Sequence, residues 1–277
     1  MTSTVPIEDE FEDIIAKTMR GRQVTEAELQ QRTGVSQDIL HRLCRGEFCD
    51  EPALLEVAKA LDLDSQALTM SASKVWRPRT VELEGLAMTN TPYRDMRVNA
   101  FLVWDPASGK AAAFDTGTDS SLLTAQAGEK ELKLEAIFLT HTHNDHIADL
   151  DRLRADWGDI PAYANEDEPW PGATLFSEGD EFSIGGLSMT TKTTSGHSVG
   201  GTTYYIEGLE RPVAVVGDAM FAGSMGGGMV SFEDAWSNNR EKILTLPDDT
   251  VLCPGHGPMT SVGEEKRNNP FFAREFR

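Results

Sequence analysis

Cysteine is scarce in this chain. Its 277 residues include only three cysteines, Cys44, Cys49 and Cys253, and no two of them form a Cys-x-x-Cys pair. An odd number of cysteines without that spacing argues against a disulfide framework. We expect Cys253 to be a small residue of a strand, and a redox role beside Pro254 is the less favoured alternative.

Positive charge and long apolar runs are also scarce. Lysine and arginine together number 25 against 45 aspartates and glutamates, which gives a net charge of −20. Such a chain repels phosphate backbones and anionic lipids, so wholesale nucleic-acid binding is disfavoured. No apolar run approaches the ~20 residues that span a bilayer, and residues 1–13 are acidic where a secretory signal would be basic and then apolar. We therefore expect a cytoplasmic protein with no membrane partner that acts on a small-molecule substrate.

Histidine is rare as well, but five of the six histidines belong to one pattern. Three of them occur in a single short run, the other two each follow a glycine, and two aspartates accompany them. The set is His141, His143, Asp145, His146, His197, Asp218 and His256. Neutral imidazole and carboxylate suit borderline divalent cations, and a site without thiolate leaves an ion strongly Lewis-acidic with open positions for water and substrate. The pattern therefore predicts a site in which these side chains share two metal ions.

The first part of the chain predicts a small helical domain. Thr25 and Glu28 form a capping box at the start of one helix. Ser36 can cap a second helix, and Asp50 opens a third whose apolar residues recur at helical spacing. A small polar stretch and a proline then interrupt any continuing helix. We expect residues 1–72 to form this domain, 73–80 to form a linker and 81–277 to form a larger domain.

The spacing of these helices resembles a lambda-repressor-like helix-turn-helix domain. The segments that carry the resemblance are Val24–Leu29, Gly34–Gln37, Leu43–Gly46 and Leu54–Leu61. The resemblance implies that the second helix lies in the major groove of DNA. Through Val75, however, eight lysines and arginines stand against fourteen aspartates and glutamates, whereas domains that neutralise phosphates are normally basic. We favour a role in packing, in assembly into a homo-oligomer or in substrate access, and DNA binding is the alternative.

The larger domain shows short apolar strands separated by turns and a few helices. Ala100–Trp104 and Ala111–Phe114 flank a turn and predict a hairpin. Ala136–Leu139 predicts a buried strand that leads directly into the histidine run, and Ile147–Trp157 has helical spacing. Two further strands are expected at Thr202–Ile206 and Val213–Val216, and the acidic run 165–168 is expected to be a solvated loop.

This order of elements and motifs resembles the metallo-β-lactamase fold. The matching motifs are Phe114–Gly117, Thr140–His146, Gly196-His197, Gly217-Asp218 and Pro254–Gly257, within residues 95–272. The resemblance implies an α+β fold class, namely a four-layer αβ/βα sandwich with metal ions at the edge of its sheets. Here a small all-α domain would precede it.

The same resemblance implies roles for the site residues. His141, His143 and His197 would hold one metal ion, Asp145, His146 and His256 would hold a second, and Asp218 would bridge them. The cofactors would be two divalent ions, with zinc expected and iron or manganese as alternatives. A metal-bridging hydroxide would attack the substrate, which makes Asp145 and Asp218 the expected catalytic residues. Asp115 would either orient a ligand histidine or cap a turn, and both interpretations stay open.

Two segments, Gly217–Ser224 and Pro254–Phe271, resemble glyoxalase-II-like hydrolases, which implies cleavage of a thioester or ester. Two departures leave specificity for glutathione open. The chain has Met225–Met229 where those proteins commonly have Ile-Gly-Arg-Thr-Asp, and the stretch after His256 is too short for the helical domain with which full-length glyoxalase II binds glutathione. The glycines at 226–228 would form a lid, an opening for a bulkier substrate or a plain loop.

Two other functions stay open at this point. Persulfide dioxygenases share the fold and use a single iron, which His141, His197 and Asp218 would hold here. The chain would instead be a transcriptional regulator if its helix-turn-helix bound DNA and its metal domain sensed a metabolite.

Overall fold

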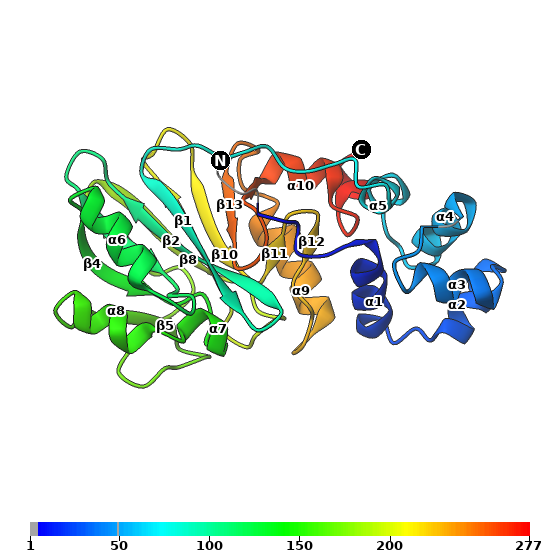
Figure 1. Ribbon diagram of the computed structural model, residues 1–277, viewed down its shortest axis with the longest axis horizontal. Coiled ribbons are helices and arrows are strands. Elements are labelled where there is room, and N and C mark those ends of the chain that lie inside the picture. The colour runs from blue at the N-terminus through cyan, green and yellow to red at the C-terminus, as the bar shows by residue number, and fades with distance from the viewer. Residues whose placement is uncertain (1–4, 49) are drawn as a thin grey trace.

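Two sheets face each other in the structure, which is a computed structural model that describes residues 5–48 and 50–277 (Figure 1). In spatial order, the first sheet contains β1 (Leu86–Tyr93), β2 (Met96–Trp104), β3 (Lys110–Phe114), β4 (Lys133–Phe138), β5 (Ala162–Asn165) and β6 (Thr174–Phe176). The second contains β14 (Thr260–Ser261), β13 (Val251–Pro254), β10 (Val213–Gly217), β9 (Thr202–Glu207), β8 (Leu187–Thr193) and β7 (Glu181–Ile184). A small separate hairpin joins β11 (Met220–Phe221) to β12 (Ser224–Met225).

Helices lie on the outer faces of the sheets and at the start of the chain. The larger domain has α6 (Ser121–Glu129), α7 (Asn144–Ile147), α8 (Leu150–Asp156), α9 (Phe232–Asn238), α10 (Val262–Asn268), a π-helical turn η1 (Asn239–Ile243) and a 3₁₀ turn η2 (Ala273–Phe276). The first part has α1 (Phe11–Gly21), α2 (Glu26–Thr33), α3 (Gln37–Leu43), α4 (Glu51–Ala60) and α5 (Ser65–Ala72). Within the described ranges, no helix is both long and apolar enough to cross a membrane.

The alternation of side chains along the strands creates the layers. In β2, Phe101 and Val103 face the core between the two sheets, while Ala100 and Leu102 face a second core beneath α6 and α8. In β10, Val215 joins the central core and its neighbours join a third core on the other side of the second sheet. Because successive residues of a strand point to opposite faces, strands that are apolar at every position must be covered on both sides. The predicted α+β four-layer sandwich is therefore confirmed.

The strand predictions for the larger domain are confirmed, and the predicted helix is shorter than expected. The predicted hairpin corresponds to β2 and β3, and the three other predicted strands to β4, β9 and β10. The helix expected over Ile147–Trp157 is interrupted between α7 and α8. Asp149 lies at this break, where its carboxylate accepts hydrogen bonds from the backbone N–H and the hydroxyl of Ser120, both at 2.7 Å. These bonds draw Asp149 out of helical geometry (φ −117°, ψ 22°), since its side chain competes with the helix for partners.

The three predicted helices of the first part are confirmed as α2, α3 and α4, with the predicted caps. Thr25 and Glu28 form both bonds of the capping box, and Ser36 and Asp50 each accept a backbone N–H at the start of α3 and α4. Helices α1 and α5 were not predicted. In the candidate reading helix α3, Arg42 donates to Glu47 (2.8 Å) and His41 lies 3.9 Å from Glu26, so acidic side chains accompany both of these groups.

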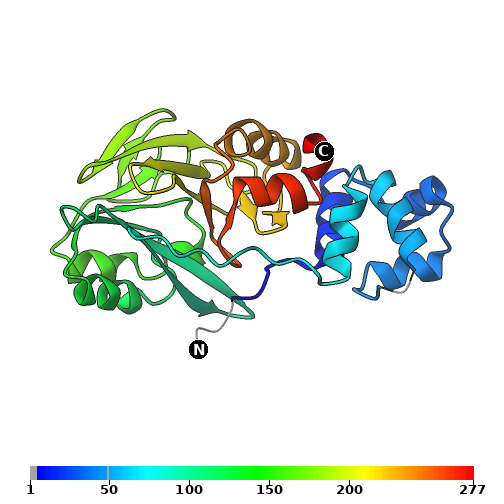
Figure 2. The ribbon, with the colours of Figure 1, turned by 90° about the horizontal axis from the view of Figure 1, so that it is seen from above.

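The helical part packs against α9, α10 and the β11–β12 hairpin, which lie beside the second sheet (Figure 2). Helices α1, α4 and α5 share one apolar core with β10, α9, α10 and the β11–β12 hairpin. The backbone N–H of Asp64 donates to the carbonyl of Pro270 (2.7 Å), and Arg274 pairs with Asp62. One continuous core therefore joins the first helices to the sheet, and the division at 72 and 80 stays a prediction.

Cys253 lies in β13 and is fully buried in the central core, as the interpretation of a small strand residue requires. Burial raises the pKa of its thiol far above the ordinary range. A buried thiol of that kind is unreactive, which disfavours the redox alternative. The other described cysteine, Cys44, is also free, and Cys49 lies outside the described residues.

A buried carboxylate in α10 should make stability depend on pH. Burial raises the pKa of Glu265 from 4.5 to about 7, although Thr260, Asn269 and the N–H of Gly223 all donate to it. The pKa of Glu265 is higher in the folded chain than in the unfolded chain. The contribution of Glu265 to the free energy of unfolding is therefore fully present below about pH 4.5 and is lost as the pH rises through about 7. We expect Glu265→Gln to remove a pH-dependent loss on the order of 3 kcal/mol.

Thermal melting between pH 5 and 8.5 measures this effect. The amide introduced by Glu265→Gln can donate to Thr260 and accept from the other two groups, so the variant should fold. The exposed Glu129 supplies the control Glu129→Gln, which should follow the wild-type curve. Parallel curves for wild type and Glu265→Gln would show that Glu265 does not titrate in this range.

Candidate metal centre

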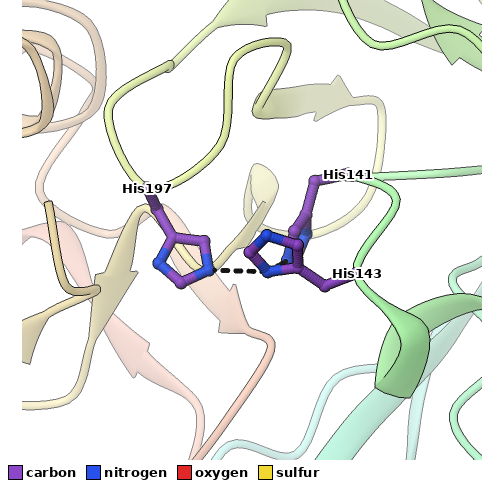
Figure 3. A group of neighbouring side chains, drawn as sticks. All are labelled: His141, His143 and His197. Carbon is purple, nitrogen blue, oxygen red and sulfur yellow. Dashed lines mark hydrogen bonds between the residues drawn. The ribbon is translucent and has the colours of Figure 1, made fainter. Parts of the chain in front are cut away.

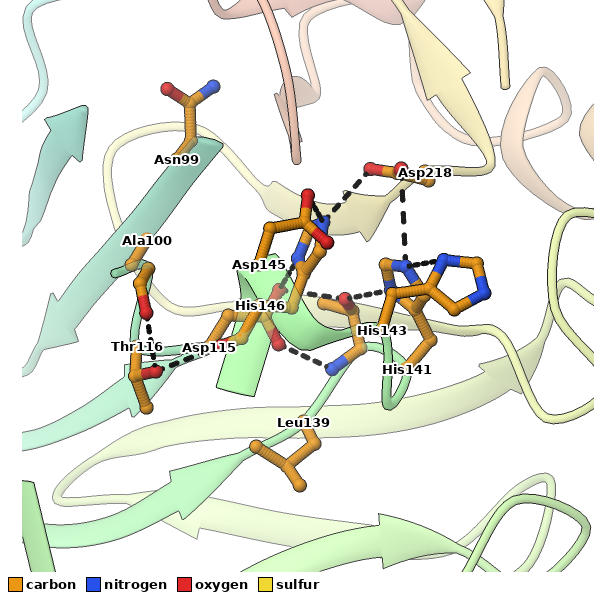
Figure 4. Close-up of polar contacts among 12 residues, drawn as sticks. Asn99, Ala100, Asp115, Thr116, Leu139, His141, His143, Asp145, His146 and Asp218 are labelled. Atoms are coloured by element: carbon orange, nitrogen blue, oxygen red, sulfur yellow. Dashed lines mark hydrogen bonds and ion pairs between the residues drawn. The ribbon is translucent and has the colours of Figure 1, made fainter. Parts of the chain in front are cut away.

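The loops that follow the strands bring the predicted site residues together at one edge of the sandwich. His141 and His143 follow β4, and the short helix α7 places Asp145 and His146 next to them. The other three site residues come from distant parts of the chain, where His197 follows β8, Asp218 follows β10 and His256 follows β13. Figure 4 shows Asp145 and His146 on α7 and Asp218 approaching them from the loop after β10.

The seven side chains form overlapping groups. Within each of three sets, the ligand atoms all lie within 4.8 Å of one another; the sets are His141, His143 and His197, then His141, His146 and Asp218, and then Asp145, His146 and His256. Figure 3 shows the first set, in which Nδ1 of His143 lies 3.1 Å from Nε2 of His141 and 3.0 Å from Nε2 of His197.

Asp218 connects these groups. Its Oδ2 lies 3.3 Å from Nε2 of His197 and 3.3 Å from Nε2 of His256, while its Oδ1 lies 3.4 Å from Nε2 of His146. The side chain is buried. One carboxylate therefore lies close to histidines of the first set and of the third set.

In four histidines the outer nitrogen, Nδ1, which lies away from the centre, makes a hydrogen bond with another residue. Nδ1 of His197 donates to the carbonyl of Gly227 (3.0 Å), and Nδ1 of His256 donates to the carbonyl of Arg97. Nδ1 of His146 donates to the carboxylate of Asp115 (2.8 Å). Because an acceptor holds a proton on Nδ1, Nε2 of each ring is the nitrogen that points into the centre and can offer its lone pair to a metal ion.

The fourth case involves a hydroxyl. Thr140 donates its hydroxyl proton to Asp115 (2.7 Å), so its oxygen can only accept from Nδ1 of His141, which is 3.0 Å away. Nε2 of His141 is thereby left unprotonated. This arrangement of imidazoles is the one that metal ligands require.

Asp115 both contacts a histidine and holds the histidine loop. Its Oδ1 accepts from the backbone N–H of Thr140 (2.8 Å), and its Oδ2 contacts His146 and the Thr140 hydroxyl. It has φ +58°, a left-handed conformation that is unusual outside glycine. Of the two interpretations left open, the contacts of Asp115 favour the orientation of a histidine.

Two buried polar atoms without hydrogen bonds indicate where a cation would bind. In the described part of the chain, Nε2 of His146 and Oδ1 of Asp218 are fully buried and make no hydrogen bond. Gly255 lies directly against them, and any Cβ there would overlap Oδ1 of Asp218 and the ring of His146. Buried polar groups without partners are costly, and a divalent cation among these nitrogen and oxygen donors would satisfy both. The residues present therefore fit a pair of divalent metal ions.

The protonation states of the site residues also favour a bound metal ion. Burial lowers the pKa of His141 and of His197, which keeps both rings neutral. Burial acts on His146 too, but Asp218 and Asp115 outweigh it and raise its pKa to about 10. Against burial, His256 and His146 hold the pKa of Asp218 well below its ordinary value. The centre thus keeps an ionised buried carboxylate that attracts positive charge, so protons and metal ions compete for it.

Glu168 supports this site although its sequence context did not predict such a role. The run 165–168 was expected to be a solvated loop, and this is wrong for Asn165, which is buried, and for Glu168, which is half-buried. Glu168 accepts from the backbone N–H and the hydroxyl of Thr142 (2.7 and 2.8 Å) and from the N–H of Gly200 (2.9 Å). Although burial raises the pKa of Glu168, these donors lower it further, so the carboxylate stays ionised. It joins the loop of His141 and His143 to the loop of His197.

Glu168→Gln should weaken the centre without unfolding the chain. The NH₂ group of the amide would face an N–H or O–H donor and could not accept its hydrogen bond. One of the two loops would therefore lose its hydrogen bond to residue 168. Since supporting residues of this kind typically change metal affinity by about 10-fold to 100-fold, we expect a loss in that range, measured by competition with a chelator. Glu166, an exposed neighbour that accepts from Ser177, provides the control Glu166→Gln. Equal affinities in the two variants would contradict this role.

Comparison with known proteins identifies relatives of the larger domain. The family model described as the metallo-beta-lactamase superfamily matches residues 93–256. The probable metallo-hydrolase YqgX of Bacillus subtilis is 33% identical over 207 residues, which cover 65% of this chain and 94% of that protein. The hydroxyacylglutathione hydrolase GloC of Haemophilus influenzae is 30% identical over 204 residues, with coverage of 65% and 95%.

A solved structure also resembles this chain. The crystal structure of TTHA1623 in a di-iron-bound form has a TM-score of 0.53 and 25% sequence identity, and the match covers 71% of this chain and all of the other.

Proposed function

This chain belongs to the metallo-beta-lactamase superfamily of metallo-hydrolases, and we propose that it cleaves a thioester or a related ester with two bound divalent metal ions. The observation that carries the proposal is the convergence of five imidazoles and two carboxylates, with the outer nitrogens of four rings fixed so that their lone pairs point inward.

The proposed ligands form two groups. His141, His143 and His197 would hold one ion, and Asp145, His146 and His256 would hold the other, with Asp218 between them. We propose zinc because the donors are imidazole and carboxylate without thiolate, and the di-iron form of TTHA1623 makes iron the principal alternative. Bound there, such ions supply Lewis acidity and lower the pKa of water toward neutrality.

Residues of the chain itself would orient the histidines and transfer protons. Asp115 and the carbonyls of Gly227 and Arg97 fix the tautomers of the histidines. Asp145 directs Oδ2 toward Nε2 of His256 (3.3 Å), and its Oδ1 can take the proton of the attacking water and return it to the leaving group.

The thioester class rests on the relatives. GloC is named a hydroxyacylglutathione hydrolase, a name that denotes a thioesterase, and the similarity covers 65% of this chain and 95% of GloC. We extend the thioester class to this chain and leave the thiol open.

A second candidate is a mononuclear iron dioxygenase acting on a persulfide. It is favoured by the subset His141, His197 and Asp218, in which Oδ2 of Asp218 lies 3.3 Å from His197 and 4.0 Å from His141. That subset would hold one iron and would need neither His146 nor His256.

A substrate panel tests the proposal. The purified full chain is assayed with a hydroxyacyl thioester of glutathione, the same acyl thioester of a simple thiol and the matching oxyester, and released thiol or acid is measured. We expect hydrolysis of a thioester that a chelator abolishes and added zinc restores. Failure to cleave any of the three after reconstitution with zinc, manganese or iron would overturn the proposal. Oxygen consumption with glutathione persulfide would support the dioxygenase instead.

A further inference from the structure

A recess lies between α1 and the glycine-rich loop that follows β12. Its walls are Lys17, Arg20 and Gly21 on the helix and Gly227, Gly228 and Met229 on the loop, and its volume is about 220 Å³. Both walls rest on Phe232 of α9, because a Cβ at Gly21 or at Gly228 would overlap that residue. The recess is therefore a fixed feature of the packing between the first helix and the larger domain.

The recess begins at a residue that touches the proposed metal centre. The carbonyl of Gly227 accepts the hydrogen bond of His197, and a Cβ at Gly226 would overlap the backbone of Asp218 and lie 3.3 Å from Nδ1 of His197. His143 and His197 are also the least buried of the five clustered histidines. A substrate that enters on their side has this recess next to it.

The two cations of the recess differ in their partners. Lys17 is half-buried; it pairs with Asp9, donates to the carbonyl of Met225 (2.9 Å) and lies 5.0 Å above the ring of Phe221. Asp9 in turn accepts from Ser224 (2.6 Å). Lys17 is therefore a structural residue that fixes α1 to the β11–β12 hairpin.

The side chain of Arg20 is exposed, and its guanidinium makes no hydrogen bond or ion pair within residues 5–48 and 50–277. A cation in the last turn of α1 is favourable for the helix dipole alone. The helix dipole, however, does not account for a recess whose described lining contains no acidic residue, in a chain with a net charge of −20.

We infer that this recess binds a carboxylate of the substrate and that Arg20 is the residue that recognises it, so the substrate is a thioester or ester whose acyl or thiol part ends in a carboxylate. The inference rests on the proposed function and names its substrate class. A guanidinium binds a carboxylate through two parallel hydrogen bonds. Met229, 76% exposed, offers an apolar surface for the carbon chain between the carboxylate and the scissile bond.

A carboxylate fits better than a phosphate-rich group. The recess is smaller than the roughly 300–1,000 Å³ of sites that hold a whole drug-sized ligand, and only one of its cations is unpaired. The strongly acidic chain would also repel a polyanion. It follows that the helical part of the chain contributes a specificity residue to the catalytic domain.

Matched substrates test Arg20. Two thioesters with the same thiol are compared, one with a four-carbon acyl group ending in a carboxylate and the other with the corresponding neutral amide. In wild type, kcat/KM should favour the acid. In Arg20→Gln that preference should fall about 10-fold to 100-fold, mainly through KM, and Arg20→Lys should recover part of it because charge is kept but the bidentate fork is lost.

Arg22, which follows the last residue of α1, gives a matched control. It is exposed, lies outside the recess and pairs with Asp62 at 3.5 Å, so Arg22→Gln should keep the wild-type preference. An unchanged preference in Arg20→Gln, or an equal loss in Arg22→Gln, would overturn the inference.

A binding measurement separates this inference from the proposed function. Succinate and inorganic phosphate are titrated calorimetrically into the metal-loaded full chain. We expect succinate to bind wild type and Arg22→Gln at least ten times more tightly than Arg20→Gln, whether or not any thioester is cleaved. Arg20-dependent binding of phosphate but not of succinate would overturn the carboxylate assignment, and binding of neither would overturn the site. Absence of thioester cleavage alone would count against the proposed function only.

Discussion

Asp218→Asn is expected to lower thioester hydrolysis about 1,000-fold or more. Among the described residues, Asp218 is the only carboxylate that lies within 3.4 Å of Nε2 of all three of His146, His197 and His256. The amide has no charge, and its NH₂ group would face imidazole nitrogens or a metal ion. Since Lewis-acid stabilisation contributes several kcal/mol to the transition state, and each 1.36 kcal/mol corresponds to a factor of ten, losing it gives a reduction of about this size.

Steady-state rates and metal content of the same preparations measure the effect. Asp248→Asn is the matched control, because Asp248 is exposed and its carboxylate pairs with Lys266 at the surface. Its rate and metal content should equal those of wild type. A thermal melt of Asp218→Asn establishes that the chain is folded. A folded variant that keeps both its metal and its rate would show that Asp218 is not a shared ligand.

His146→Asn should distinguish the two candidate functions. His146 is fully buried, donates to Asp115 and directs Nε2 to Asp218, and it belongs to the group with Asp145 and His256. If the enzyme is a two-metal hydrolase, the variant should lose one of two ions and about 100-fold to 1,000-fold or more of its rate. A mononuclear iron enzyme that relies on His141, His197 and Asp218 should keep its single iron and most of its activity.

The remaining histidine supplies the control. His41 is exposed on α3 and lies far along the chain from the centre, 3.9 Å from Glu26. His41→Asn should therefore match wild type in metal content and rate. Retention of full hydrolysis by folded His146→Asn would contradict the two-metal proposal, and loss of the single iron from the same variant would contradict the mononuclear alternative.

Individual strands and helices could be predicted because their periodicity is local, whereas the four layers were implied by the resemblance of the motifs to a known fold. Apolar runs such as that of β10 specify a strand covered on both faces, and Thr25, Ser36 and Asp50 specify where helices begin. The break at Asp149 depends on Ser120, a residue distant in sequence, so helical spacing alone could not reveal it.

The histidine pattern was visible in the sequence because the residue type is rare and chemically specific. Glu168 was not, since an acidic residue in an acidic run carries no local signal that Thr142 and Gly200 will donate to it. The contacts of Arg20 and Lys17 were hidden for the same reason. They depend on how α1 packs on α9 and the β11–β12 hairpin, and such packing is set by the tertiary structure.

Metal content of the purified full chain tests the central claim most directly. Elemental analysis after reconstitution, combined with anomalous diffraction at the metal edges, should find two divalent ions per chain, one among His141, His143 and His197 and one among Asp145, His146 and His256. Finding one ion at most, or finding ions away from these side chains, would contradict the account.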